Sequence, residues 1–341
     1  MKALIIGGTG TISSAVVRLL VERGWDTYVL NRGSKPLPNG AKQIIADIHD
    51  EAALCTKLRG MRFDTVCDFI GFERPDVERD FRLFKDRTDQ YIYISSASVY
   101  NKPARSYIIN EGTALANPYW KYSRDKIACE EFLMEKYRSE GFPVTIVRPS
   151  HTYGEWSIPI GVRGNKGFWQ VIKRIREGKP VIIQGDGTSL WTLTFNTDFA
   201  VGFVGLMGNP HAVGEAFNIT SDETLTWNQI YETIAQALGM PLHAYHVSAD
   251  FLGAVGSQFG FDCSMMGDKS VSVVFDNSKL KRAVPEFNAT VSFARGVRIA
   301  LDYILSHPEY QVEDPEFDSW CDRVIEVLEK AKSEFKATPH N

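Results

Sequence analysis

Lys2-Ala3-Leu4-Ile5-Ile6-Gly7-Gly8-Thr9-Gly10-Thr11 opens the chain and decides its fold. The apolar run at residues 2–6 is typical of a central parallel strand that is buried on both faces. Apolar side chains recur at helical spacing over residues 11–22, so the glycines mark a turn from strand to helix. Such a turn brings backbone N–H groups and a helix N-terminus to a pyrophosphate. The opening stretch therefore predicts a dinucleotide-binding site.

The alternation of strand and helix continues to about residue 149. Further strands are predicted at 27–30, 43–46, 65–70, 90–95 and 143–147, with helices near 51–58, 75–84 and 118–139. Strands that alternate with helices form parallel sheets with helices on both faces. We therefore expect an α/β fold built on a Rossmann-type, doubly wound parallel sheet.

The composition excludes several classes of partner. The 341 residues carry 38 Lys and Arg against 42 Asp and Glu, so a net charge of −4 gives no reason to expect nucleic acid or an anionic membrane. No apolar run approaches ~18 residues and the chain enters a strand at once, so we expect a cytoplasmic protein without a membrane span. The five cysteines lack CxxC spacing, which indicates reduced thiols, and no metal site is predicted.

Tyr122 and Lys126 are the clearest candidates for catalysis. They lie four residues apart on a predicted helix, so their side chains share one face about one turn apart. A tyrosine is a poor base at neutral pH, but a neighbouring ammonium group favours its ionised form. The same spacing is common on surface helices. Its position after the fifth strand and the serine-rich turn at 95–98 favours the catalytic interpretation.

Four segments in this order resemble one known family: Gly7–Gly10, Ser95–Tyr100, Tyr122–Lys126 and Arg148–Gly154. They are similar to those of the extended short-chain dehydrogenase/reductase family, specifically its NAD-dependent epimerase/dehydratase branch, and an atypical subgroup also fits. The resemblance runs from the N-terminus to about residue 305, which is nearly the whole chain.

The resemblance implies a division into two parts. Residues 1–155, completed by roughly 194–222, would form the dinucleotide-binding domain. Residues 156–193 and 223–341 would form a smaller α+β substrate lobe with a C-terminal helical extension. That extension, an amphipathic stretch near 314–335, lies beyond the usual family end and is expected to pack on the lobe or on a neighbouring subunit.

The resemblance also implies roles for individual residues. Ser96, Tyr122 and Lys126 would be catalytic, with Ser95 and Ser98 as alternatives for the hydroxyl group. Asp68 is expected to be structural. The expected cofactor contacts are Gly7, Thr9, Gly10, Thr11, Ile12, Asn31, Arg32, Asp47, Ile48, Ile70, Gly71, Ser95, Tyr122, Lys126, Pro149 and His151.

The end of the second predicted strand bears on the choice between NAD and NADP. An acidic residue there would accept hydrogen bonds from the ribose 2′-OH and favour NAD. The chain has Asn31 and Arg32 instead, and Arg32 would pair with a 2′-phosphate or stack on adenine, unless it only lies on the surface. The expected cofactor is NADP or NAD, with a slight preference for NADP.

The substrate side departs from the family pattern at Trp191. Nucleotide-sugar enzymes usually resemble GDGxxxR here, and their arginine clamps the diphosphate. The tryptophan favours a bare sugar, glycoside or aromatic substrate, although Arg163, Lys166 or Arg295 would restore a phosphate site. The candidate substrate contacts are Ser98, His151, Trp156 and Trp191, and Trp156, Trp169 and Trp191 would form a stacking wall unless they pack in the core.

The leading interpretation is an NAD(P)-dependent epimerase of a sugar or nucleotide sugar that removes and returns hydride at a carbinol carbon. The alternative is a net NADP-dependent dehydrogenase or ketoreductase with the same residues. Dehydration is disfavoured because Ala97 and Ser98 replace the acidic residues of the dehydratases. A non-enzymatic, RNA-binding interpretation is disfavoured by the acidic balance and the complete Ser/Tyr/Lys set.

The expected partners are a small sugar-type substrate and a second copy of the chain. Family members commonly form homodimers through the helix that carries YxxxK and the helix before it. Here those helices are predicted near 75–84 and 118–139.

Overall fold

The computed structural model describes residues 1–337 and divides the chain into two compact units. The first unit contains residues 1–154, 191–224 and 271–292, and the second contains 155–190, 225–270 and the residues from 293 onward. The expected substrate lobe included residues 271–292, and this placement was wrong. Strand β14 (Val274–Phe275) pairs with β6 (Ile108–Ile109), and Leu280 packs in the core beneath the main sheet, so this segment belongs to the first unit.

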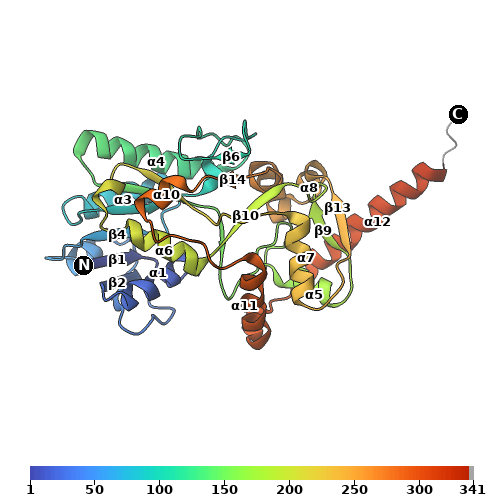
Figure 1. The fold of residues 1–341 in the computed structure, drawn as a ribbon, viewed down its shortest axis with the longest axis horizontal. Helices are drawn as coiled ribbons and strands as arrows, with labels where there is room; N and C mark the ends of the chain where they lie inside the picture. Colours follow the sequence, from blue (N-terminus) through green and yellow to red (C-terminus); the bar gives the residue numbers. More distant parts are fainter. Residues whose placement is uncertain (338–341) are drawn as a thin grey trace. The chain divides into compact units, whose positions relative to one another are not determined.

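Within the described residues 1–337, a seven-stranded parallel sheet forms the centre of the first unit (Figure 1). Its order is β11-β7-β5-β4-β1-β2-β3, in which the chain starts in the middle, runs to one edge and then returns to build the other half. This is the predicted doubly wound Rossmann-type sheet, and the prediction is confirmed. The strands are β1 (Lys2–Ile6), β2 (Asp26–Asn31), β3 (Lys42–Ile45), β4 (Thr65–Asp68), β5 (Tyr91–Ile94), β7 (Val144–Pro149) and β11 (Ala216–Ile219).

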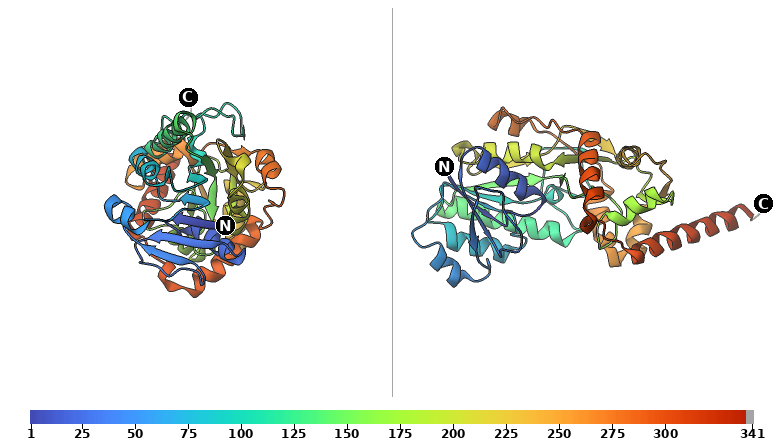
Figure 2. Two further views of the ribbon diagram at one scale, coloured as in Figure 1. Left: turned by 90° about the vertical axis from the view of Figure 1, so that its left-hand side faces the viewer. Right: turned by 90° about the horizontal axis from the view of Figure 1, so that it is seen from below.

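Helices cover both faces of this sheet (Figures 1 and 2). In β1, Ala3 and Ile5 pack against one layer, formed by α1 (Thr11–Glu22), α6 (Asn196–Leu206) and α10 (Ser278–Ala283). Leu4 and Ile6 pack against the other, formed by α2 (Glu51–Lys57), α3 (Arg74–Phe84) and α4 (Lys121–Glu140). Alternate residues point to opposite faces of a strand, so burial on both faces explains the continuous apolar run at the N-terminus.

The helix that carries Tyr122 begins later than predicted. The pattern predicted a start at Pro118, but α4 begins at Lys121. Asn117 does not cap the helix directly. Its side chain accepts hydrogen bonds from the N–H groups of Tyr119 (3.3 Å) and Trp120 (3.2 Å) and donates to the carbonyl of Ser98 (2.8 Å). These bonds hold residues 117–120 as a turn that is tied to the serine-rich segment.

Shorter strands and turns complete the first unit. Strand β8 (His151–Tyr153) pairs in parallel with β10 (Leu190–Phe195), and β12 (Thr224–Thr226) stands where the chain passes into the second unit. Short 3₁₀ turns occupy Ala97–Val99 and Pro210–Ala212.

The second unit is mainly helical. It contains one parallel strand pair, β9 (Val181–Gln184) with β13 (Ala244–Val247). Its helices are α5 (Trp169–Arg176), α7 (Trp227–Ala237), α8 (Ala249–Val255), α9 (Phe261–Ser264), α11 (Phe293–Ser306) and α12 (Pro315–Ala337), with shorter helical turns at Ser257–Phe259, Met265–Lys269 and Pro308–Tyr310.

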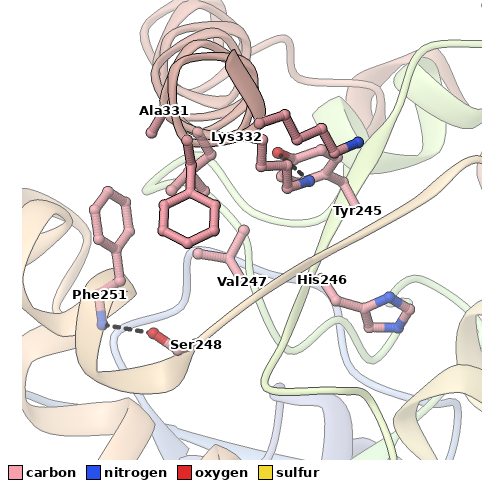
Figure 3. A pocket seen from close by; sticks show the side chains of 10 residues that line it. Tyr245, His246, Val247, Ser248, Phe251, Ala331 and Lys332 are labelled. Carbon is pink, nitrogen blue, oxygen red and sulfur yellow. Dashed lines mark hydrogen bonds between the residues drawn. The ribbon is translucent and has the colours of Figure 1, made fainter. Parts of the chain in front are cut away.

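Helix α12 is the C-terminal extension that the sequence indicated. Its first half is held by the buried Arg174 of α5, which donates to Asp318 and Asp322 at 2.7 Å each. Its last turns lie over β13 and α8 and leave a hollow of about 470 Å³ between them (Figure 3). At its edge the Tyr245 hydroxyl donates to Glu329 (2.7 Å) and accepts from Lys332 (3.1 Å). The extension therefore packs on the rest of the second unit mainly through its first half, where Phe317, Cys321 and Val324 are buried, whereas its described residues from Glu329 onward are exposed.

Candidate active site

A hollow of about 430 Å³ lies in the first unit where β1, β2, β3 and β4 end. The carboxyl ends of parallel strands beside a reversal of strand order are where α/β sheets bind ligands. Seven of the predicted cofactor contacts line it: Gly7, Thr9, Asn31, Arg32, Asp47, Ile48 and Ile70. It is also lined by residues that the sequence did not single out: Leu30, Ser34, Ala46, His49, Phe72 and Asp76.

The glycine turn at the base of this hollow needs its glycines. Gly7 and Gly8 have φ angles of 105° and 66°, which side chains disfavour, and a Cβ on Gly8 would overlap Val29. Gly10 precedes α1, and its N–H donates to the hydroxyl of Ser13 at 3.0 Å. Ser13, which stands at the third glycine position of the motif, is buried and caps the turn. Gly10, Thr11 and Ile12 themselves lie at the helix start and do not line the hollow.

Asn31 and Arg32 have different surroundings at the end of β2. The side-chain oxygen Oδ1 of Asn31 accepts from the N–H of Gly33 (2.9 Å) and from Nε2 of Gln43 (2.8 Å), so this side chain shapes the loop. Arg32 is exposed and lines the hollow together with Ser34. Asp47 accepts from the N–H of His49 at 3.0 Å, which turns the chain after β3 along the same wall.

Lys126 is buried, with 2% of its surface exposed, and its ammonium is held by backbone oxygens. Nζ donates to the carbonyl of Gly71 (2.7 Å), which follows β4, and to the carbonyl of Ile94 (2.8 Å), which ends β5. It lies 5.9 Å from the ring centre of Tyr122, which is partly exposed on the same helix face. Burial lowers the pKa of Lys126 to about 8, against the opposing charge of Asp68. The predicted pair is therefore brought together, with the lysine behind the tyrosine.

The serine-rich turn presents one hydroxyl group. Ser96 is partly exposed, whereas Ser95 and Ser98 are buried. The Ser96 oxygen accepts from the N–H of Ser98 (3.2 Å) and lies 2.9 Å from the Ser98 hydroxyl. Ser98 in turn accepts from the hydroxyl of Ser123 at 2.8 Å. Ser123 donates to Ser98, and the Ser96 and Ser98 hydroxyls share one hydrogen bond in which either can be the donor, so Ser96 is the partly exposed end of this chain of hydroxyls.

This chain of hydroxyls changes the expectation for Ser98. It was a candidate substrate contact, but it is buried behind Ser96 and its hydroxyl group is engaged on both sides. Ser123, which follows Tyr122 directly, was not predicted to take part. Only the pairing of α4 with the turn shows its role, because a serine inside a helix carries no sequence signal of its own.

The remaining predicted residues divide between the units. Trp191 and His151 belong to the first unit, where the indole N–H of Trp191 donates to Nδ1 of His151 at 3.4 Å. Trp191 is 4% exposed, so its ring has little free face for the predicted stacking. Trp156 and Trp169 belong to the second unit, and Trp169 is buried with the Arg176 guanidinium 5.7 Å from its ring centre. Pro149 ends β7 inside the core.

No metal site accompanies these groups. Over residues 1–337, no cluster of three or more His, Cys, Asp or Glu side chains has the arrangement to hold an ion. The cysteines of the described chain are all free thiols.

Comparison with known proteins finds a family domain in the middle of the chain. Residues 80–220 match the model of the NAD dependent epimerase/dehydratase family, a range that includes the serine turn, Tyr122 and Lys126. The protein carries a domain of this family. It is therefore an enzyme of the epimerase/dehydratase type, as the sequence predicted.

Individual relatives have low sequence identity to the chain but match it over much of its length. The chain is 25% identical over 304 residues to 2′-dehydrokanamycin reductase of Streptomyces kanamyceticus, covering 88% of this chain and 84% of the relative. It is 29% identical over 255 residues to the chloroplast stem-loop binding protein of 41 kDa b of Arabidopsis thaliana, covering 70% and 64%. The fold resembles that of UDP-glucuronic acid 4-epimerase from Bacillus cereus, solved with UDP-glucuronic acid and NAD (TM-score 0.71, 21% identity, 90% and 99% covered).

Replacing Ser123 with alanine tests the chain of hydroxyl groups. Ser98 then loses the hydrogen bond from Ser123, and the Ser96 hydroxyl that is bonded to Ser98 is held less firmly. We expect kcat to fall about tenfold at unchanged cofactor affinity, since misplacing a catalytic group costs up to roughly 10²-fold. Steady-state kinetics on the substrate of the wild type measure this.

The matched control for that variant is Ser139→Ala, which removes an exposed hydroxyl from the last turn of the same helix. It should leave kcat unchanged. A wild-type kcat in Ser123→Ala would show that Ser96 is oriented without this chain.

Proposed function

We propose that the protein is an NAD(P)-dependent sugar epimerase that acts by reversible hydride transfer at a carbinol carbon. The observation that carries the proposal is the buried ammonium of Lys126, held by two backbone carbonyls beside the partly exposed Tyr122. Burying a charged lysine is unfavourable unless its hydrogen bonds are satisfied, so a site of this kind is costly to build. A cation next to a tyrosine is the arrangement that makes the phenol a usable base.

The residues at the sheet edge fit a nicotinamide dinucleotide. The turn at Gly7 and Gly8 has no side chains in the way, and it leads into the N-terminus of α1, where a pyrophosphate is favourable. Ile70 and Phe72 offer exposed apolar surface on the wall of the hollow, suited to a flat aromatic ring. When bound, the nicotinamide would accept or return hydride. The solved relative that resembles this fold was obtained with NAD.

Three side chains of the protein then have different roles at the carbinol oxygen. Tyr122 takes the hydroxyl proton as the general base. The partly exposed Ser96 hydroxyl donates to the same oxygen and so stabilises the developing charge. The Lys126 ammonium near the Tyr122 ring favours the phenolate over the phenol, and the N–H that Lys126 does not donate to the two carbonyls remains for a ribose hydroxyl.

Net reduction of a ketone is the second candidate function, because a relative that matches over 88% of this chain is named 2′-dehydrokanamycin reductase. The residues would be the same, and only the fate of the cofactor differs. An epimerase works with a catalytic amount of cofactor and gives no lasting change in absorbance at the nicotinamide band. A reductase consumes NADPH in proportion to product. We propose no RNA-binding role, despite the name of one relative, because the chain carries a net charge of −4.

We further propose a cytoplasmic homodimer formed through α3 and α4. Among residues 1–337, no helix combines the length and the apolar character needed to cross a membrane.

Replacing Tyr122 with phenylalanine removes the proposed base and leaves the lysine and the glycine turn in place. We expect the rate of hydride transfer to fall by roughly 10²–10⁴, with cofactor affinity changed little. Tyr119→Phe is the matched control, since Tyr119 is exposed three residues earlier. Pre-steady-state absorbance and calorimetry supply the two readings. Near-normal activity in Tyr122→Phe would refute the mechanism.

The preference for NADP rests on Arg32. Its guanidinium lines the hollow where a carboxylate would favour NAD, so the Arg32→Ala variant should lose NADPH affinity and keep NADH affinity. A hydrogen bond to a charged group contributes about 1.5–3 kcal/mol, which corresponds to roughly 10–100-fold in affinity. Arg59→Ala, an exposed arginine after α2, is the control. Equal losses for both cofactors, or no loss, would remove Arg32 from the specificity argument.

The substrate is proposed to lack a nucleotide. Trp191 stands where the family's nucleotide-sugar enzymes carry a diphosphate-clamping arginine, and its N–H is spent on His151. The name of the reductase relative gives 2′-dehydrokanamycin as that protein's substrate and mentions no nucleotide.

We therefore expect UDP, GDP and their glucose conjugates to bind weakly, with dissociation constants in the millimolar range, because the clamp is missing. Calorimetry on the cofactor-loaded wild type measures this. Micromolar binding of either nucleotide would show that another cation replaces the clamp.

A further inference from the structure

Asp68 is a fully buried carboxylate at the end of β4 that the proposed mechanism does not use. One of its oxygens, Oδ1, accepts from the N–H groups of Ile70 (2.8 Å) and Gly71 (3.0 Å). These two bonds close the turn that follows the strand. The other oxygen, Oδ2, lies 3.4 Å from the hydroxyl of Tyr91.

The turn that Asp68 closes connects the two halves of the site. Ile70 and Phe72 line the hollow proposed for the cofactor, and Gly71 between them is buried. The Gly71 carbonyl accepts from Lys126 (2.7 Å) and from the Tyr93 hydroxyl (3.2 Å). A Cβ on Gly71 would overlap Asp68 Oδ2, so glycine is required for the carboxylate to sit this close.

Asp68 is the carboxyl group whose charge acts most strongly on Lys126; burial raises the pKa of Asp68, and its hydrogen bond from Ile70 and the charges of Lys126 and Arg79 oppose that rise. On α3, Arg79 pairs with Asp76 (3.1 Å) and Asp80 (2.9 Å), and Asp80 also accepts from Tyr91 (2.8 Å). On α4, Glu130 pairs with Arg148 at 2.6 Å.

The carboxylate without a hydrogen-bonded cation is therefore Asp68, and the ammonium without a hydrogen-bonded carboxylate is Lys126. They are joined through Gly71, whose N–H bonds to one and whose carbonyl bonds to the other. The other titratable groups near Lys126 are Tyr93 on β5 and Tyr122 and Cys129 on α4.

We propose that Asp68 is a positioning residue of the reaction centre: through the turn at 70–72 it holds Lys126 in place and balances its charge. This rests on the proposed function only in taking Lys126 as part of the catalytic machinery. The same carboxylate fixes the backbone at Ile70, while the N–H of Phe72 is held by Asp76 (2.9 Å), so one buried group contributes to both the cofactor surface and the position of the lysine.

The direction of the charge effect follows from the surroundings of Lys126. Burial lowers the pKa of Lys126 to about 8, and the charge of Asp68 is the largest effect that opposes this shift. Removing that charge lowers the pKa of Lys126 further. The lysine then loses its proton at a lower pH, and the alkaline limit of turnover moves down with it.

Asp68→Asn is the variant that separates charge from shape. The amide keeps an oxygen for the N–H groups of Ile70 and Gly71 but carries no charge. The midpoint of the Lys126 titration, followed through its side-chain ¹³Cε signal, is expected to fall by about 1 pH unit, the lower end of the shift that a nearby opposite charge produces. Asp125→Asn is the control, because Asp125 lies beside Lys126 in sequence but pairs with Lys121 on the surface. An unchanged midpoint in Asp68→Asn would overturn the proposal.

Gly71→Ala tests the same clamp if Asp68→Asn does not fold. Its Cβ forces the turn away from Asp68, and NADPH affinity is expected to fall about tenfold as the wall at Ile70 and Phe72 shifts. Wild-type affinity together with a wild-type Lys126 midpoint would overturn the proposal. The titration needs no substrate, so an absence of turnover in the wild type would refute the proposed function and leave this result standing.

Discussion

The buried ammonium of Lys126 is the constraint on which the candidate site depends. A charge taken out of water must be met by hydrogen bonds, and here two backbone carbonyls at the ends of neighbouring strands meet it. Those carbonyls are fixed only because β4 and β5 lie side by side in the sheet. The helix α4 must then pass close to the strand ends, which also places Tyr122 and Ser123 beside the serine turn.

Much of the fold could be predicted because the sequence repeats one local pattern. Apolar runs that end in glycine or serine, each followed by a helical period, specify parallel strands without any knowledge of distant contacts. Residues 271–292 were assigned to the substrate lobe because their true position depends on distant contacts. The pairing of β14 with β6 joins segments more than 160 residues apart, and two-residue strands carry almost no periodicity of their own.

Site residues could be proposed from the sequence where their spacing along the chain brings them together, but not where only burial in the folded protein does. Tyr122 and Lys126 share a helix face because they are four residues apart, and the glycine turn follows its strand directly. By contrast, the hydrogen bond between Ser98 and Ser123 joins two elements of the fold. Asp68 is linked to Lys126 only through the Gly71 turn, which tertiary packing brings to the lysine. The stacking role expected of Trp191 stays a prediction, and the sequence did not show that its ring is buried.

The central claim is that the hollow beside Lys126 holds a nicotinamide dinucleotide. Isothermal titration calorimetry of the purified wild-type protein with NADPH and with NADH tests it most directly. The account predicts one cofactor bound per chain, with a dissociation constant in the micromolar range or below for at least one of the two. The absence of binding by either cofactor at millimolar concentration, in protein shown to be folded and free of co-purified nucleotide, would contradict it.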